Sequence, residues 1–168
     1  GVSQPKLTRQ GILKKIEQYE KEGRFDEDVE EDPPSRELLP DEVDYLKRRL
    51  ISRVNARHAF RIARWFMNAM LLKKQLIIKD VIGIENFKEL SGGAIITCNH
   101  FNPMDSFAMQ IVYEKAKKRG KKFFRIIKEG NYTSFPGFYG FLMRNCNTLP
   151  LSSNKDTMKK FLKAVGVI

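Results

Sequence analysis

The stretch "IITCNHFNPMDSF" at residues 95–107 decides the fold, because it changes abruptly from apolar to polar. The preceding run, 94–98, is short and continuously apolar, which is typical of a strand buried on both faces of a parallel sheet. His100 follows that run, and Asp105 comes five residues later. In open α/β sheets, ligands gather at the carboxyl ends of the strands. The pattern therefore predicts a strand that delivers a histidine to a ligand-binding edge.

The H-x4-D spacing predicts that His100 and Asp105 form a pair. Asp105, near the start of the next helix, would accept a hydrogen bond from one imidazole nitrogen and leave the other facing the cleft as an acceptor. That is how a general base and its orienting acid divide their roles. No serine or cysteine is placed as a nucleophile, so the expected chemistry is direct: His100 takes a proton from a substrate hydroxyl, which attacks an activated acyl group. The alternative is a strand-end histidine satisfied by a loop carbonyl.

The segments around this stretch predict an α/β domain. We expect strands over 75–87, 94–98, 122–129 and 148–152, and helices over 104–120 and 152–165. Their order favours a mainly parallel sheet with flanking helices, preceded by an N-terminal helical segment. Cys98 is expected to be a small core residue at the end of its strand, and Cys146 is expected to be structural.

Two segments precede that domain, which we place at residues 75–168. Residues 1–40 are predicted to form an arm, with a helix over 5–22 and an acidic, proline-containing linker over 23–40. Residues 41–74 are predicted to be a basic amphipathic helix that starts after Pro40. The expected break lies near 52–55, where its apolar face drifts. This helix either packs on its own domain with solvated arginines outside, or lies on a membrane with its apolar face in the interface and its arginines on lipid phosphates.

Length, charge and cysteine content set the remaining bounds. With 168 residues, the chain is one domain long. Its net charge of +11 favours a polyanionic partner, such as nucleic acid, an anionic membrane or a phosphorylated substrate. No apolar run is long enough to cross a bilayer, and no secretory signal is visible. Two cysteines without metal-ligand spacing predict no metal site and a reducing cytoplasm.

Two blocks resemble the signature blocks of the glycerolipid acyltransferases, the 1-acylglycerol-3-phosphate acyltransferase family. "AIITCNHFNPMD" (94–105) looks like the first block, an apolar strand followed by N-H-x4-D. "IIKEGNYTSFPGFYGFLMRNCNTLPL" (126–151) looks like the second, in which a strand ending in lysine leads to a Pro-x-x-x-Gly loop, a short helix and a further strand. The resemblance covers about residues 76–165.

The resemblance implies a function and a set of site residues. The family moves a fatty acyl chain from acyl-CoA or acyl-carrier protein to a hydroxyl of a lysophospholipid, as in phospholipid biosynthesis, without a cofactor. It works at the membrane, often through N-terminal helices, so we expect a peripheral protein on the cytoplasmic face, bound to an anionic membrane surface. By resemblance, His100 is the base and Asp105 its partner. The implied substrate-binding residues are Asn99, Lys128, Pro136, Gly140 and Arg144.

The chain departs from the family pattern in two places. An arginine that usually follows the second block, and helps to hold the acceptor phosphate, is replaced by Ser152-Ser153. Arg144, Lys128 or Lys155 would have to substitute for it, unless the acceptor differs. The third and fourth blocks would lie beyond Ile168, so we expect an N-terminal piece of a longer enzyme, and the 168 residues alone need not be active.

Two other functions remain open at this stage. A nucleic-acid-binding module would use the arginine-rich helix, but it would leave the His–Asp spacing without a role, and we expect no nucleic-acid partner. A non-catalytic module at the membrane surface would keep the fold without the reaction. The aromatic residues over 135–141 predict either an acyl-chain groove or a packed corner.

Overall fold

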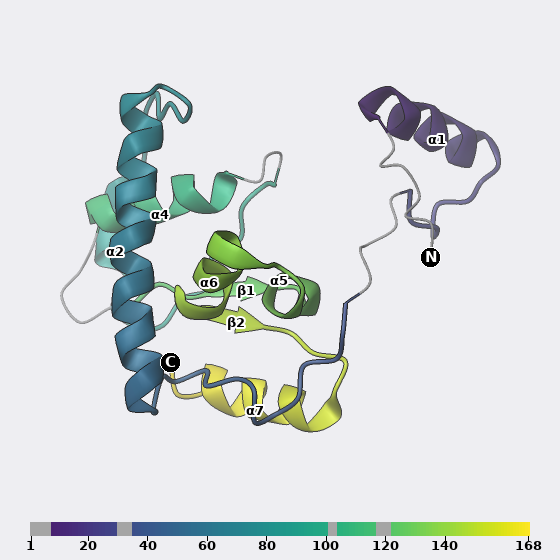
Figure 1. Cartoon of the computed structure of the whole chain (residues 1–168). Coiled ribbons are helices and arrows are strands. Elements are labelled where there is room, and N and C mark those ends of the chain that lie inside the picture. Colours follow the sequence, from purple (N-terminus) through teal and green to yellow (C-terminus); the bar gives the residue numbers. More distant parts are fainter. Residues whose placement is uncertain (1–7, 30–34, 101–103, 117–121) are drawn as a thin grey trace. The chain divides into compact units, whose positions relative to one another are not determined.

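The computed structural model describes residues 8–29, 35–100, 104–116 and 122–168. The chain divides into two compact units, Gly1–Pro34 and Ser35–Ile168. The described residues form these elements (Figure 1): α1 (Arg9–Lys21), α2 (Leu50–Leu72), α3 (Ile84–Glu89), α4 (Asp105–Ala116), β1 (Arg125–Ile127), α5 (Glu129–Thr133), α6 (Gly137–Asn145), β2 (Thr148–Pro150) and α7 (Lys155–Val165).

The described part of the first unit, residues 8–29, contains one helix, as its sequence predicts. Thr8 begins α1 as N-cap, and its hydroxyl accepts a hydrogen bond from the Gly11 amide at 3.3 Å. The chain then turns back, because the Lys15 ammonium donates to the Val29 carbonyl at 2.8 Å. No residue of α1 is buried.

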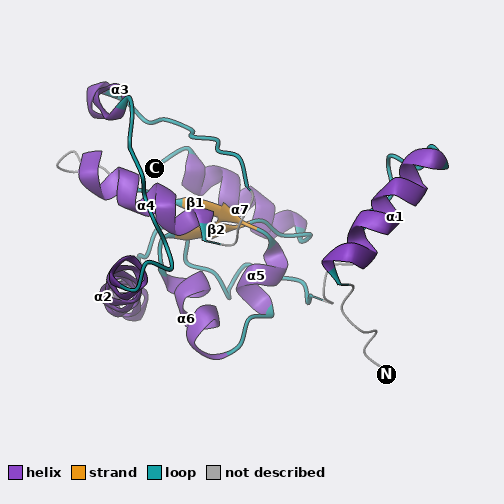
Figure 2. Ribbon diagram, turned by 90° about the horizontal axis from the view of Figure 1, so that it is seen from above, coloured by secondary structure: helices purple, strands orange, loops and turns teal. Residues whose placement is uncertain are grey.

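The second unit is built around a pair of parallel strands, β1 and β2. Ile126 lies opposite Leu149 in the register, and the whole of β2 is buried. Helices lie around the strand pair (Figure 2). The predicted strands over 122–129 and 148–152 are confirmed as β1 and β2, and their parallel pairing is confirmed. The predicted helix over 152–165 is confirmed as α7. The helix predicted over 104–120 is confirmed as α4 as far as Ala116, and its last residues, 117–120, lie outside the described residues. The result is a mixed α/β fold in which helices predominate.

The larger sheet that the sequence indicates is not formed by the described residues. The segment 75–83 forms no strand and leads into α3, so the strand predicted at 75–87 is wrong. The strand predicted at 94–98 is also wrong: this run has no strand partner, and Ile95 is 88% exposed. Cys98 is likewise exposed rather than in the core. An apolar run becomes a strand only where a neighbouring strand satisfies its backbone groups, which composition alone does not reveal.

The long basic helix starts later than predicted and is not interrupted. Residues 41–49 form turns, because the Asp44 carboxylate accepts hydrogen bonds from the amides of Arg48 at 3.0 Å and Arg49 at 2.9 Å. A side chain bonded in this way competes with helix formation. From Leu50 onward α2 is continuous, so the predicted break near 52–55 is wrong.

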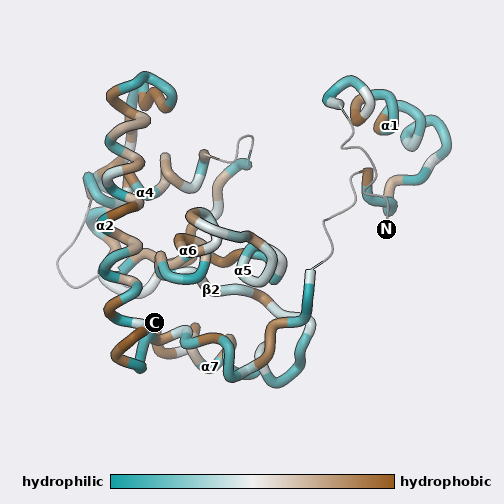
Figure 3. Tube along the Cα trace, viewed as in Figure 1, coloured by the Kyte–Doolittle hydropathy of each residue, from teal (hydrophilic) through white to brown (hydrophobic). Residues whose placement is uncertain are grey.

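The predicted apolar stripe of α2 packs inside the second unit. Ala59, Met67 and Met70 are buried, and Ala59 clusters with Leu142 and Cys146 of α6 and its C-cap. Hydrophobic and hydrophilic residues alternate along α2 in Figure 3, as expected for a helix with one packed face. None of the helices among the described residues combines the length and the apolar character needed to cross a bilayer.

Residues 35–46, here called the strap, belong to the core rather than to a loose linker. Leu38, Val43 and Tyr45 are at most 2% exposed and cluster with Phe161 of α7 and Leu149 of β2. Polar bonds hold the strap as well. The Leu38 carbonyl accepts from the hydroxyls of Ser152 at 2.9 Å and Thr157 at 2.8 Å, the Tyr45 hydroxyl donates to the Pro150 carbonyl at 2.8 Å, and the Lys160 ammonium donates to the carbonyls of Pro40 and Val43. The linker predicted at 23–40 therefore extends too far, because its last residues, 35–40, belong to the strap.

Candidate active site

His100 and Asp105 lie within reach of one another. Asp105 is the first residue of α4, and its carboxylate oxygen Oδ2 lies 3.2 Å from the imidazole nitrogen Nδ1 of His100. The side chain of His100 is 76% exposed, whereas that of Asp105 is 29% exposed. The more buried carboxylate therefore holds one edge of a ring that solvent and solutes can reach.

This geometry suits proton transfer at the second ring nitrogen. With the proton on Nδ1 and donated to Asp105, Nε2 of the neutral ring is an acceptor. A hydroxyl that approaches Nε2 can give up its proton there, and the imidazolium that forms is stabilised by the neighbouring carboxylate. Asn99 directly precedes His100 in the sequence and is also exposed.

Pro136, Gly140 and Arg144 form a second group around α6. Pro136 is the N-cap of α6, and its carbonyl accepts from the Gly140 amide at 3.2 Å. The guanidinium of Arg144 donates to the carbonyls of Tyr132 at 3.3 Å and Phe135 at 3.1 Å. A Cβ atom at position 140 would collide with the Phe135 carbonyl and would lie 2.8 Å from the Arg144 guanidinium. Glycine at position 140 therefore lets Arg144 fold over the turn before α6.

Lys128 lies at the carboxyl end of β1, where it is exposed and begins α5 as N-cap. Glu129 follows, and its carboxylate accepts hydrogen bonds from three residues: from the Leu38 amide at 2.7 Å, from the Ser152 hydroxyl at 2.7 Å, and from the amide and hydroxyl of Ser153 at 3.2 and 3.0 Å. Burial raises the pKa of Glu129, but these hydrogen bonds lower it by more. Ser152 and Ser153 thus bind a carboxylate at this edge.

Glu129 was not predicted from the sequence as part of this region. Its signal is its position: a carboxylate directly after a strand, with two hydroxyl residues directly after the neighbouring strand. Since parallel strands bring their carboxyl ends to one edge, that combination indicates a cluster of acceptor and donors. The structure therefore brings the predicted residues together in two groups, His100 with Asp105 and Pro136–Gly140 with Arg144, while Lys128 begins α5 beside the Glu129 cluster.

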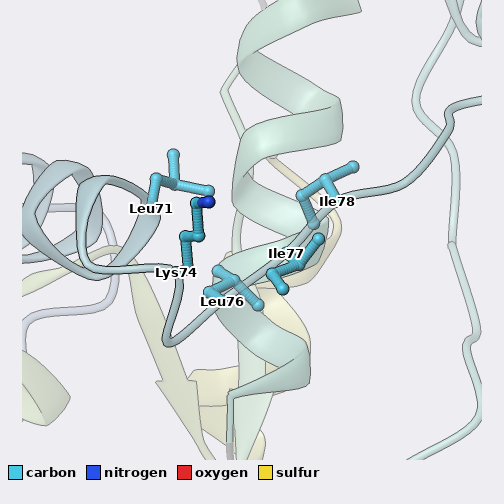
Figure 4. A pocket seen from close by; sticks show the side chains of 5 residues that line it. All are labelled: Leu71, Lys74, Leu76, Ile77 and Ile78. Atoms are coloured by element: carbon cyan, nitrogen blue, oxygen red, sulfur yellow. The ribbon is translucent and has the colours of Figure 1, made fainter.

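The aromatic residues before and within α6 are partly packed. Phe66 of α2 lies 5.7 Å from Phe138 and 6.3 Å from Tyr139, ring centre to ring centre, yet both are more than two-fifths exposed. These residues are therefore a corner that is packed on one side and open on the other. A separate open hollow of about 410 Å³ lies where α2 ends, lined by Leu71, Lys74, Leu76, Ile77 and Ile78 (Figure 4). It includes none of the predicted site residues.

The two cysteines have different environments, since Cys98 is exposed and Cys146 is buried. Cys146 is buried at the C-cap of α6, and burial raises the pKa of its thiol to about 11. A thiol with that pKa stays neutral near pH 7 and reacts slowly. The buried position of Cys146 agrees with its predicted structural role.

Comparison with known families matches the part of the chain that carries these groups. The family model described as Acyltransferase matches residues 79–166, which include His100, Asp105, the α6 group and both strands. No curated protein and no solved structure gives a significant match. The matched region is just over half of the chain. The protein therefore belongs to the acyltransferase family, the family of the glycerolipid acyltransferases.

Proposed function

We propose that this acyltransferase moves a fatty acyl group from acyl-CoA or acyl-carrier protein to the free hydroxyl of a lysophospholipid, such as 1-acylglycerol 3-phosphate, as a step of phospholipid biosynthesis. The observation that carries the proposal is the 3.2 Å contact between His100 Nδ1 and Asp105 Oδ2, with an exposed ring, inside the region that matches the family. A general base needs an acceptor nitrogen, an orienting partner and access to the substrate, and this pair can supply all three.

The proposed reaction is a single acyl transfer. Nε2 of His100 removes the proton from the acceptor hydroxyl while the hydroxyl oxygen attacks the carbonyl carbon of the thioester. The new C–O bond forms and the C–S bond breaks, so the products are an ester and a thiolate. The imidazolium then gives its proton to the thiolate, which leaves as the free thiol. Each turnover therefore releases one thiol for each ester formed, and the base returns to its starting state.

The cations near the strand ends and α6 suggest how the acceptor phosphate is held. Arg144 already donates to two carbonyls, so it can hold a phosphate only with the rest of its guanidinium. Lys128 is exposed at the carboxyl end of β1, where the fold gathers ligands. We therefore propose Lys128 as the main phosphate contact, with Asn99, Pro136 and Gly140 shaping the substrate site.

The direct test is a thiol-release assay of the protein. Acyl-CoA and acylated carrier protein are offered in turn with 1-acylglycerol 3-phosphate, and released thiol is compared with diacyl product. We expect equal amounts of released thiol and diacyl product with at least one of the two donors. Thiol release without lipid product would show a hydrolase, and neither product would support a non-catalytic module; either result overturns the proposal.

Substrates that reside in a bilayer require membrane association, and we propose the outward face of α2 as its site. The apolar face of α2 packs inward and cannot also contact lipid. We therefore propose that the opposite face of the helix contacts the membrane. One exposed stripe follows three- and four-residue spacing, and so lies on a single helix face. Its members are Ile51, Val54, His58, Arg61, Trp65, Asn68 and Leu72.

The segment that carries this exposed stripe is strongly basic. Residues 45–79 include ten basic residues and no acidic one. Trp65 is 70% exposed and Leu72 is 84% exposed. Exposed tryptophan and leucine beside arginines fit the boundary between lipid head groups and acyl chains better than a nucleic-acid backbone, which offers no apolar layer.

Replacing Trp65 and Leu72 together with alanine is expected to weaken vesicle binding about tenfold or more. Fully burying either side chain contributes roughly 1.5–3 kcal/mol, so even partial insertion of both gives this loss. Binding is measured by flotation with phosphatidylcholine vesicles, with and without phosphatidylglycerol, over a salt titration. The matched control replaces Leu162 and Val167, which are 63% and 69% exposed in and after α7. Equal losses in both proteins, or tighter binding to duplex DNA than to the anionic vesicles, would contradict the assignment.

A further inference from the structure

We propose that Gln110 and Arg125 are positioning residues that fix the place of α4, and through it the carboxylate that orients His100. This inference rests on the proposed function for its catalytic meaning, and on the contacts of α4 for its geometry. The two residues connect the middle of α4 to the first residue of β1. Neither belongs to the sequence blocks that indicate the family chemistry.

Gln110 is a polar residue on the buried side of α4. It is only 8% exposed, and both ends of its amide are bonded. Its oxygen accepts a hydrogen bond from the Arg125 guanidinium, and its nitrogen donates to Glu114 at 3.1 Å. A buried amide that lost these partners would keep the full cost of its desolvation, so the pairing is strongly favoured.

Arg125 extends this contact into the rest of the unit. Its guanidinium also donates to the Cys146 carbonyl at the end of α6, at 3.3 Å, and lies 5.1 Å from the centre of the Phe123 ring. Burial lowers the pKa of Arg125. The residue remains a cation, because an arginine is not deprotonated in proteins. One side chain thus connects α4, β1 and the end of α6.

Two other kinds of contact hold α4: an ion pair, in which the Glu114 carboxylate lies 3.7 Å from the Arg64 guanidinium of α2, and aromatic contacts, which are less directional. Phe107 lies 5.7 Å from Phe66 of α2, and Tyr113 lies between Phe87 and Phe123, at 6.4 and 5.2 Å from ring centre to ring centre. Aromatic packing holds a helix against its neighbours, but it tolerates small slides and rotations. Hydrogen bonds weaken steeply outside a narrow range of distance and angle. The bond from Arg125 to Gln110 therefore sets the axial position and rotation of α4.

The position of α4 decides the position of Asp105. Asp105 precedes Gln110 by five residues, which is about 7.5 Å along a helix axis. A rigid helix transmits a slide at Gln110 to Asp105 unchanged, and the 3.2 Å contact to His100 cannot survive a shift of about 1 Å as a good hydrogen bond. Misplacement on that scale costs a reaction roughly 100-fold. Gln110 and Arg125 thereby act on the reaction without touching the substrate.

The test replaces Gln110 with methionine, which has a similar length but cannot make either hydrogen bond. The ring-nitrogen NMR signals of His100 report the contact to Asp105 directly and need no turnover. We expect them to move toward those of an Asp105→Asn protein, while the signals of His58, the other histidine, stay unchanged. In a chain that is active, kcat should fall about 10- to 100-fold with KM unchanged. Gln110→Glu keeps an acceptor for Arg125 and should restore most of the wild-type signals.

The matched control is Lys115→Met, which makes the same replacement at an exposed position of α4. It should leave the His100 signals in place. Unchanged signals in Gln110→Met, or equal changes in both methionine proteins, would overturn the inference. If Gln110→Met does not fold, Arg125→Lys replaces it, because lysine lacks the forked donor that reaches Gln110 and Cys146 together; the same two outcomes then decide. A clear NMR result without acyl transfer would preserve the positioning role and reject the proposed function alone.

Discussion

Replacing His100 with alanine is expected to lower acyl transfer by about 10²–10⁴-fold, the range over which a positioned general base contributes. Without the imidazole, the acceptor hydroxyl must lose its proton to water, and the hydroxyl is too weak an acid to do so quickly near pH 7. The exposed ring means that its removal leaves little unsatisfied in the core, so the folded state should be preserved. Initial rates of thiol release, with circular dichroism as the check on folding, measure the effect.

The chain provides a matched control for this experiment, because His58 is its other histidine and is also exposed. His58→Ala should change the rate in detergent-dispersed substrate by less than about twofold, in line with the small effects of surface replacements. The acyl-transfer rate of Asp105→Asn should lie between the rates of His100→Ala and His58→Ala. The asparagine keeps the shape of the partner but stabilises the imidazolium less. Near-normal rates for His100→Ala in a folded protein would remove His100 as the base.

The contact between His100 and Asp105 was predictable from the H-x4-D spacing, because two residues this close in sequence can meet by local chain geometry alone. The structure places their side chains 3.2 Å apart, as predicted. The helices α4 and α7 were predictable for a related reason: their periodicity and caps are local, as with Asn154, whose side chain accepts from the amides of Asp156 and Thr157. The parallel pairing of β1 and β2 followed from the helices between them.

The wrong strands and the missed polar contacts have a different cause, since they depend on contacts between residues far apart in the chain. The run 94–98 has the composition of a buried strand, but composition does not state whether a second strand lies beside it. The polar contact of Gln110 with Arg125 joins residues from a helix and a strand, and neither residue carries a local signal. Glu129 likewise bonds to Leu38, a residue 91 positions away along the chain.

The strap gives the most decisive test of such long-range contacts. Leu38→Ala is expected to lower the free energy of unfolding by about 2–5 kcal/mol, the range for truncating a buried leucine. Leu38 is 0% exposed and packs in the same cluster as Tyr132, Leu149 and Phe161. Removing its side chain leaves a cavity between the strap, β2 and α7. Urea unfolding followed by circular dichroism measures the change.

The next residue supplies the control, since Leu39 is 43% exposed while its backbone follows the same path. Leu39→Ala should cost less than about 1 kcal/mol, because truncating a half-exposed side chain opens no closed cavity. A loose acidic linker would make the two replacements equivalent, and both would be close to neutral. A large difference between neighbours of identical chemistry can come only from burial, so it would establish that the strap is part of the folding unit. Because the backbone amide of Leu38 also donates to Glu129, the residue next to Lys128, a docked strap would further connect core stability to the edge where we place the acceptor phosphate.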